Sequence, residues 1–184
     1  MSEWKVGEPK FASFKPPIVL MGMMGAGKTT VGRIVARELG WEFEDLDAVI
    51  VRGTGLEIAD IFSRYGEEGF RKCEHRYLKE MLSSANSLVL ALGGGTVGLH
   101  ENRELLQKTA VVWLKGPLPL LYSRVANDAT RPLARMGWEV FEARYRQREP
   151  WFRSLAWMIE DVAERSSEEI AQNIISIWQT GVRE

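Results

Sequence analysis

The chain has 184 residues, enough for one domain that buries about two thirds of its unfolded surface around a single core. Its 24 lysines and arginines nearly balance its 25 aspartates and glutamates, so the net charge of −1 does not favour binding to nucleic acid or to an anionic membrane. No apolar run approaches the roughly 20 residues that span a bilayer. Cys73, the single cysteine, cannot form a disulfide within the chain, which is typical of a cytoplasmic protein.

The first 15 residues differ from the rest in composition. They mix lysines, glutamates and isolated aromatic residues, without the apolar core of a signal peptide or the acid-free, arginine-rich pattern of a transit peptide. We expect residues 1–15 to form a flexible tail and residues 16–184 to form one domain.

The first predicted elements are a buried strand over residues 18–21 and a helix with an apolar stripe over residues 30–39. Between them, residues 22–29 fit the pattern GxxxxGK[ST] in the required order of strand, loop and helix. Glycines allow backbone N–H groups to turn toward phosphate oxygens, and the helix N-terminus adds the positive end of its dipole. This stretch predicts a site for a nucleoside triphosphate.

The predicted contacts with ATP come from this loop. We expect Lys28 to reach the β- and γ-phosphates and the hydroxyl of Thr29 to bind Mg²⁺. The residues predicted to bind ATP here are Gly25, Ala26, Gly27, Lys28, Thr29 and Thr30.

A second strand is predicted over residues 41–44, and it leads to an Asp-x-Asp motif at Asp45 and Asp47. The strands expected to end at Leu92 and Leu114 carry no acidic residue there, so Asp45 is the nearest candidate to bind Mg²⁺ directly or through water. If the strand continues, Asp47 points the same way and could serve as general base. The alternative is a solvated pair that caps the next helix.

Two helical stretches follow, one around residues 58–62 and one over residues 70–81. Arg71 and Glu74 lie three positions apart on the second stretch and can pair, although the residues alone favour a solvated ion pair. An apolar strand over residues 87–92 then runs into Gly93, Gly94 and Gly95. Three glycines at the end of a buried strand predict close approach of a ligand to the backbone.

The polar segment over residues 127–137, which contains Arg131, is either a mobile lid or a surface connection. The other predicted elements are helices over 101–108, around 118–125, over 138–149 and over 167–178, the last capped by Ser166 or Ser167, and strands over 110–114 and 156–159. Strands that alternate with helices predict a parallel sheet covered on both faces, with ligands at the carboxyl ends of its strands.

In combination, these motifs resemble the shikimate kinase family from about Ile18 to the final helix. The resemblance rests on their order: GMMGAGKTTVGR, Asp45-Leu46-Asp47, Ile61-Phe62 before Gly66-Glu67, Phe70-Arg71 with Glu74, Leu92-Gly93-Gly94-Gly95, Arg131-Pro132-Leu133 and Arg148-x-Pro150. It implies a three-layer α/β/α P-loop kinase fold with a central parallel sheet and a mobile lid. The implied reaction is Mg²⁺-dependent transfer of the γ-phosphate of ATP to the 3-hydroxyl of shikimate, a step of chorismate and aromatic amino-acid biosynthesis.

The resemblance also implies which residues bind the acceptor. Asp47 would contact the ring hydroxyls and assist deprotonation, and Arg71 and Arg148 would hold the carboxylate. Glu74 would orient Arg71, and the glycines at 93–95 would approach the ring with their backbone.

On the nucleotide, Arg124 would stack on adenine and Arg131 would neutralise the transferring phosphate from the lid. The chain departs from the family pattern at Ala134, where leucine is common, and at residues 151–152, where Leu-Tyr is usual.

The alternatives to shikimate kinase are a gluconate or nucleoside monophosphate kinase, and a nucleotide-binding module without catalysis. The expected partners are ATP and shikimate only, and the expected state is a monomer.

Overall fold

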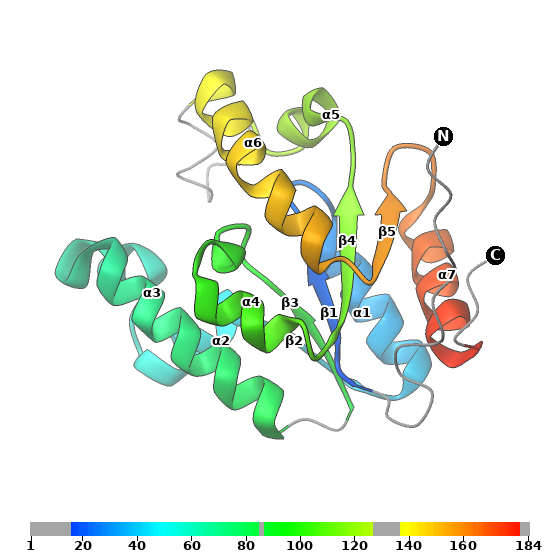
Figure 1. Ribbon diagram of the computed structural model, residues 1–184, viewed down its shortest axis with the longest axis horizontal. Coiled ribbons are helices and arrows are strands. Elements are labelled where there is room, and N and C mark those ends of the chain that lie inside the picture. Colours follow the sequence, from blue (N-terminus) through cyan, green and yellow to red (C-terminus); the bar gives the residue numbers. More distant parts are fainter. Residues whose placement is uncertain (1–15, 85–86, 127–136, 181–184) are drawn as a thin grey trace.

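The computed structural model describes residues 16–84, 87–126 and 137–180 (Figure 1). Residues 1–15 and the main part of the predicted lid, with Arg131, lie outside these ranges. The elements are β1 (Ile18–Met21), α1 (Lys28–Leu39), β2 (Glu42–Asp45), α2 (Leu46–Thr54), α3 (Ile58–Ser84), β3 (Leu88–Ala91), the 3₁₀ turn η1 (Thr96–Gly98), α4 (His100–Leu106), β4 (Ala110–Lys115), α5 (Leu118–Ser123), α6 (Gly137–Leu155), β5 (Met158–Asp161) and α7 (Ser167–Thr180).

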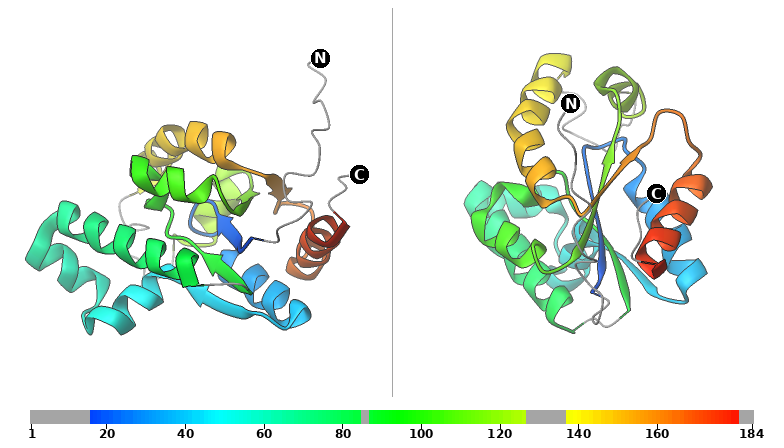
Figure 2. Two further views of the ribbon diagram at one scale, coloured as in Figure 1. Left: turned by 60° about the horizontal axis from the view of Figure 1, so that its bottom comes forward. Right: turned by 45° about the vertical axis from the view of Figure 1, so that its right-hand side comes forward.

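The five strands form one sheet in the order β2-β3-β1-β4-β5, and every neighbouring pair is parallel. Strands β1 and β3 consist of apolar residues that are all buried, as expected when helices cover both faces of a sheet. Helices α1 and α7 lie on one face, and α3, α4 and α6 lie on the other (Figure 2). The predicted three-layer α/β/α fold is confirmed.

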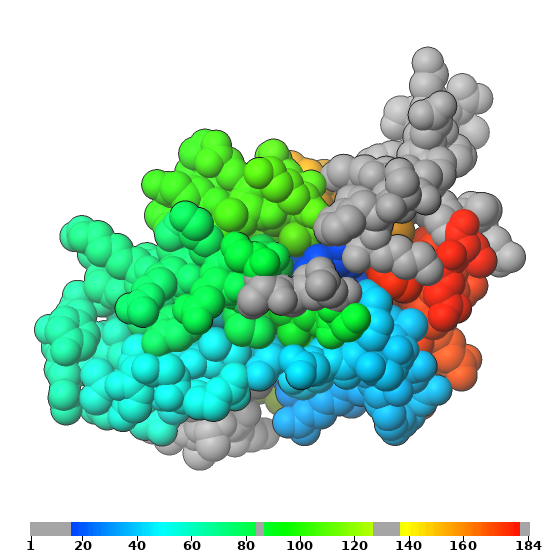
Figure 3. Space-filling view, turned by 90° about the horizontal axis from the view of Figure 1, so that it is seen from below, coloured from blue at the N-terminus to red at the C-terminus, as the bar shows by residue number. Residues whose placement is uncertain are grey.

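The last helix of the fold packs against the first. Seen from below, α7 lies beside α1 (Figure 3), and Trp178 of α7 meets Trp41 edge to face with ring centroids 4.7 Å apart. At its N-terminus, α7 is closed by a capping box in which the Ser166 hydroxyl accepts from the backbone N–H of Glu169, whose carboxylate accepts in return from Ser166. The predicted cap at Ser166 is confirmed.

The Asp-x-Asp motif differs from the prediction in its backbone. Strand β2 ends at Asp45, because the Asp45 carboxylate accepts a hydrogen bond of 3.1 Å from the backbone N–H of Asp47 and thereby caps α2. The strand does not continue to Asp47, so the condition for Asp47 to point the same way as Asp45 is not met, and Asp47 lies in the first turn of α2. The alternative that the motif caps the next helix is correct, but the side chains are partly buried rather than solvated.

Helix α3 joins the two predicted helical stretches across Gly66, whose φ of 67° and ψ of −175° interrupt the helix. This φ is readily adopted only by glycine. Phe62 and Phe70, on either side of the break, stack with ring centroids 4.5 Å apart and hold the two halves together.

Several predicted boundaries differ from the structure, among them those of α6 and β5. Helix α6 passes through Pro150 and ends at Leu155, whereas the predicted helix ended at residue 149. Strand β5 begins at Met158, two residues later than expected. In the described ranges, no helix is long and apolar enough to span a membrane.

Candidate active site

The loop between β1 and α1 is shaped by glycines with positive φ. Gly25 has a φ of 83°, and a Cβ built on it would lie 2.4 Å from the carbonyl oxygen of Leu121, so a side chain is excluded there. Lys28 folds back over the loop, where its Nζ donates to the carbonyl oxygens of Gly22 and Met23, both at 3.0 Å. The ammonium group is thus held at the mouth of the loop.

The N-terminus of α1 is open to an anion. Its N-cap is Gly27, which offers no side-chain cap, and the first turn contains no acidic residue. By contrast, α2 is capped by the carboxylate of Asp45. The N–H groups of the first turn and the positive end of the helix dipole suit the start of α1 to a phosphate group. Ala26 can contribute only its backbone there, since its side chain is buried, whereas Thr30 is exposed.

Thr29 and Asp45 meet at the base of this loop. The Thr29 hydroxyl donates a 3.2 Å hydrogen bond to Oδ2 of Asp45, while Oδ1 of the same carboxylate caps α2. A hydroxyl and a carboxylate side by side next to a phosphate site are the hard oxygen donors that Mg²⁺ prefers. The two residues predicted to bind the metal are therefore brought together and fit it.

Three side chains from three helices converge on the glycine triplet that follows β3. A Cβ built on Gly93 would lie 3.2 Å from Oδ1 of Asp47 in α2, and one on Gly94 would lie 3.2 Å from Nη1 of Arg148 in α6. One built on Gly95 would lie 2.6 Å from Nη2 of Arg71 in α3. The triplet is needed because these charged groups lie directly against its backbone. The four predicted parts of the acceptor site are thus assembled.

The glycine triplet also adjoins the loop between β1 and α1, which we call the phosphate loop. A Cβ on Gly94 would lie 3.5 Å from the carbonyl oxygen of Gly22. Together with the contact between Thr29 and Asp45, this places the residues predicted to bind the acceptor beside the phosphate loop, at the carboxyl edge of the sheet.

Arg148 and Arg71 raise the positive potential of this site. Burial is the main cause that lowers the pKa of Arg148 to about 10, and the nearby charges of Arg144 and Arg71 lower it further. The cation at Arg148 is therefore held in an environment that disfavours its charge. A bound anion would relieve that cost, and the planar guanidinium groups suit a carboxylate.

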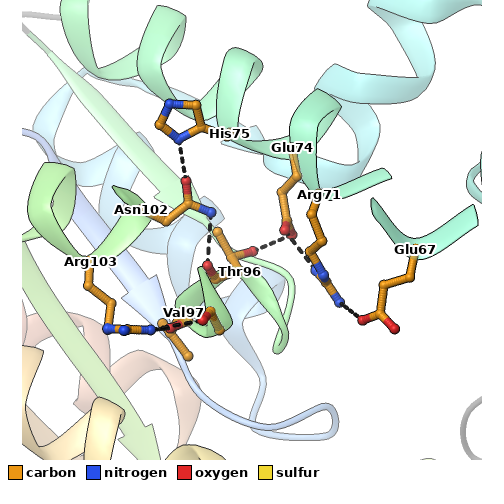
Figure 4. Close-up of polar contacts among 9 residues, drawn as sticks. Glu67, Arg71, Glu74, His75, Thr96, Val97, Asn102 and Arg103 are labelled. Atoms are coloured by element: carbon orange, nitrogen blue, oxygen red, sulfur yellow. Dashed lines mark hydrogen bonds and ion pairs between the residues drawn. The ribbon is translucent and has the colours of Figure 1, made fainter. Parts of the chain in front are cut away.

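Glu74 fixes the side chain of Arg71 through a buried ion pair. The Glu74 side chain is fully buried, and its Oε2 accepts a 2.7 Å hydrogen bond from Nη1 of Arg71 (Figure 4). The expectation of a solvated ion pair is wrong, because the helix turns this carboxylate into the protein rather than toward water. Glu67 is a weaker and exposed neighbour of Arg71, at 3.4 Å from Nη2.

Arg124 connects the phosphate loop with the loop after β5. Its Nη1 donates to the carbonyl oxygen of Gly25 at 3.2 Å, and its Nη2 donates to that of Val162 at 3.4 Å. The side chain is thus beside the nucleotide loop, while its predicted stacking on adenine stays a prediction.

A family model described as shikimate kinase matches residues 24–179, most of the chain. The chain belongs to the shikimate kinase family. A curated shikimate kinase from Psychrobacter cryohalolentis is 42% identical over 147 residues, which cover 78% of each chain. One from Marinomonas sp. is 37% identical over 164 residues, covering 87% of this chain and 90% of its own. The predicted family is confirmed.

A solved structure of shikimate kinase supports the same assignment. The shikimate kinase from Acinetobacter baumannii in complex with shikimate superposes with a TM-score of 0.83 at 36% identity, covering 97% of this chain and 100% of that chain. Membership of the shikimate kinase family replaces the alternative of a gluconate or nucleoside monophosphate kinase. Sequence reasoning missed Thr96 and Asn102, two buried polar residues behind the glycine triplet that the residue pattern alone does not mark.

Proposed function

We propose that Asp47, Arg71 and Arg148 bind shikimate and direct its 3-hydroxyl toward ATP held by the phosphate loop. ATP-dependent phosphorylation of shikimate is the activity of the family to which the chain belongs. The observation that carries the residue assignment is the convergence of these three side chains on Gly93–Gly95, beside Gly22 of the phosphate loop.

The acceptor is held through its carboxylate. Two guanidinium groups from separate helices fix both the position and the plane of a carboxylate, which a single flexible cation does not. The glycine backbone then approaches the ring without side chains. Asp47, held in the first turn of α2, accepts the proton of the 3-hydroxyl as its oxygen attacks the γ-phosphorus. The bond between the γ-phosphorus and the β,γ-bridging oxygen breaks, and ADP leaves.

The phosphates are held by the backbone N–H groups at the start of α1 and by Lys28. Thr29 and Asp45 would hold Mg²⁺, which supplies neutralisation of the phosphate charge when bound. Arg131 completes this proposal as a lid residue that neutralises the transferring group, and Arg124 as the residue that stacks on adenine. Replacing Arg131 by alanine should reduce turnover more than ATP affinity, as measured by steady-state kinetics beside an ATP-binding titration.

The first experiment measures ADP release by the purified protein with MgATP, with and without shikimate, beside Asp47→Asn. Shikimate-dependent turnover is expected, with shikimate 3-phosphate as the product in ³¹P NMR. The variant should lose about 10²- to 10⁴-fold in kcat while still binding ATP, because only the proton acceptor is removed. ATP binding without any stimulation by shikimate would refute the proposal and leave the alternative of a nucleotide-binding module without catalysis.

The proposal extends to the setting of the enzyme. We place it as a monomer in the reducing cytoplasm, in line with the balanced charge and the single cysteine, and size-exclusion chromatography with light scattering tests the monomer.

A further inference from the structure

Behind the glycine triplet lies a cluster of three charged or polar side chains that are all fully buried. Glu74, Thr96 and Asn102 each have 0% exposure, although they come from α3, η1 and α4. Of the three, only Glu74 has an expected role, which is to orient Arg71. Full burial of polar groups is costly unless each is hydrogen-bonded. The burial of Thr96 and Asn102 must therefore be explained by hydrogen bonds that they make.

The hydroxyl of Thr96 supports the carboxylate of Glu74. Its Oγ1 donates a 2.6 Å hydrogen bond to Oε1 of Glu74. The other carboxylate oxygen accepts from Arg71 at 2.7 Å. Glu74 is thus fixed from both sides, and one of its two fixed contacts is the arginine beside Gly95 (Figure 4).

Asn102 holds the same threonine by its backbone. Its Nδ2 donates a 2.9 Å hydrogen bond to the carbonyl oxygen of Thr96, which fixes the orientation of the amide because a carbonyl cannot donate. Oδ1 of Asn102 then faces Nδ1 of His75 at 2.8 Å, and this ring nitrogen must carry the proton. A continuous line of hydrogen bonds therefore runs from His75 to Arg71.

Thr96 is also the residue that follows the glycine triplet. Its backbone N–H donates to the carbonyl oxygen of Gly93 at 3.2 Å, so holding Thr96 also holds the curve of the triplet. Within the described residues, no buried side-chain nitrogen or oxygen lacks a partner. Removing the hydroxyl of Thr96 would leave one oxygen of a buried carboxylate without its donor.

We infer that Thr96 and Asn102 are positioning residues, which hold Glu74 and the glycine triplet so that Arg71 presents its remaining N–H groups to the acceptor carboxylate. The inference rests on the proposed role of Arg71 in binding shikimate. Neither residue touches the acceptor in this scheme. Their loss therefore acts on binding of the acceptor and leaves the phosphate loop and ATP unaffected.

The experiment compares Thr96→Val, which keeps the shape of the side chain and removes the hydroxyl, with Thr96→Ser, which restores a hydroxyl. Thr96→Val should raise the KM for shikimate about tenfold and leave the KM for ATP within about twofold, because a buried charged acceptor loses its donor. Thr96→Ser should recover most of the shikimate affinity. Assays are run below the melting temperature of each variant.

Thr109→Val is the matched control. Thr109 is the other buried threonine among the described residues, and its hydroxyl donates at 2.8 Å to the carbonyl oxygen of Leu106, away from the site. This variant should lose thermal stability as Thr96→Val does, with both KM values unchanged. An equal rise in the KM for shikimate in both valine variants would overturn the inference, because it would reveal a general effect of buried hydroxyl loss.

A double variant tests whether Thr96 acts through Arg71. In the background of Arg71→Met, Thr96→Val should add less than about twofold to the KM for shikimate, since the group that it positions is gone. Asn102→Leu acts on Thr96 from the carbonyl side and should raise the same KM about threefold. Full additivity in the double variant would overturn the inference.

The two proposals fail differently. An unmodified protein without shikimate-dependent turnover would remove the proposed function. An active unmodified protein whose Thr96→Val variant keeps the original KM for shikimate would overturn only the positioning role.

Discussion

The two halves of the candidate active site differ in whether backbone or side-chain groups shape them. The nucleotide half is shaped mainly by backbone: glycines with positive φ, an N-terminus of α1 without a side-chain cap, and the loop carbonyls that hold Lys28. The acceptor half consists of charged side chains from α2, α3 and α6, supported by buried polar groups. A backbone site recognises phosphate in any nucleotide, whereas an arrangement of side chains can be specific for one acid.

The largest effect is expected when the backbone half is broken. Gly25→Ala would force a residue with a Cβ into a φ of 83° and against the carbonyl oxygen of Leu121 at 2.4 Å. The strained conformation alone costs about 1–3 kcal/mol, and the clash is with backbone that cannot move aside. ATP binding measured by calorimetry should be lost. Retained ATP affinity would show that this loop does not need the conformation seen here.

Arg148→Met tests the acceptor half. Shikimate affinity should fall about 100-fold, since roughly 2–3 kcal/mol of charged hydrogen bonding is removed, while ATP affinity stays. The melting temperature of the free protein should rise by a few degrees, because the lowered pKa of Arg148 means that folding disfavours its charge. Arg146→Met, at an exposed position on the same helix, is the control for both measurements. A lower melting temperature would contradict this account.

The pH dependence of shikimate binding follows from the same group. With a pKa of about 10, Arg148 stays charged at neutral pH, and its unfavourable contribution to stability declines only as the pH rises above that value. The KM for shikimate should therefore be level from pH 7 to 9 and rise above about pH 10. If the KM for shikimate of the Arg148→Met variant rises at the same pH, a group other than Arg148 causes the change.

A smaller effect is expected at Gly95. A Cβ there would lie 2.6 Å from Nη2 of Arg71, but this neighbour is the end of a flexible side chain that can shift. Gly95→Ala should raise the KM for shikimate about tenfold without changing that for ATP. Gly98→Ala is the matched control, because its Cβ would meet only Trp151 at 4.0 Å. Equal KM values in both variants would show that Arg71 does not act from its place beside Gly95.

The smallest effect is expected outside both halves. Ser166→Ala removes the cap of α7 and should cost about 1 kcal/mol of stability, visible in chemical denaturation, with both KM values unchanged. A change in the KM for ATP or for shikimate would mean that the site depends on the N-terminal cap of α7.

The sequence predicted the nucleotide half well because its elements are contiguous. The pattern of residues 22–29 determines the loop, and the apolar runs around it determine strand and helix. The order of strands and helices was sufficient for the parallel sheet. The predicted boundaries differed where a local cap intervened, as at Asp45, and where a helix continued through a proline, as α6 does at Pro150.

The acceptor half could not be derived from spacing alone. Glu74 and Arg71 have the spacing of an ordinary surface pair, and only the packing of α3 against η1 shows that the carboxylate is buried. Asn102 carries no signal at all, since its role depends on the position of a carbonyl oxygen six residues earlier in the chain. The family resemblance supplied the roles of Arg71 and Arg148, and the structure supplied their convergence.

The contact between α1 and α7 has a consequence for how the protein is made. The helix that begins with Lys28 leaves the ribosome more than a hundred residues before residues 167–180, yet the two helices pack against each other. Folding during synthesis therefore cannot complete the support of the phosphate loop until residues 167–180 have emerged. A nascent chain that stops before α7 is expected to lack nucleotide affinity although it already contains every residue of the loop.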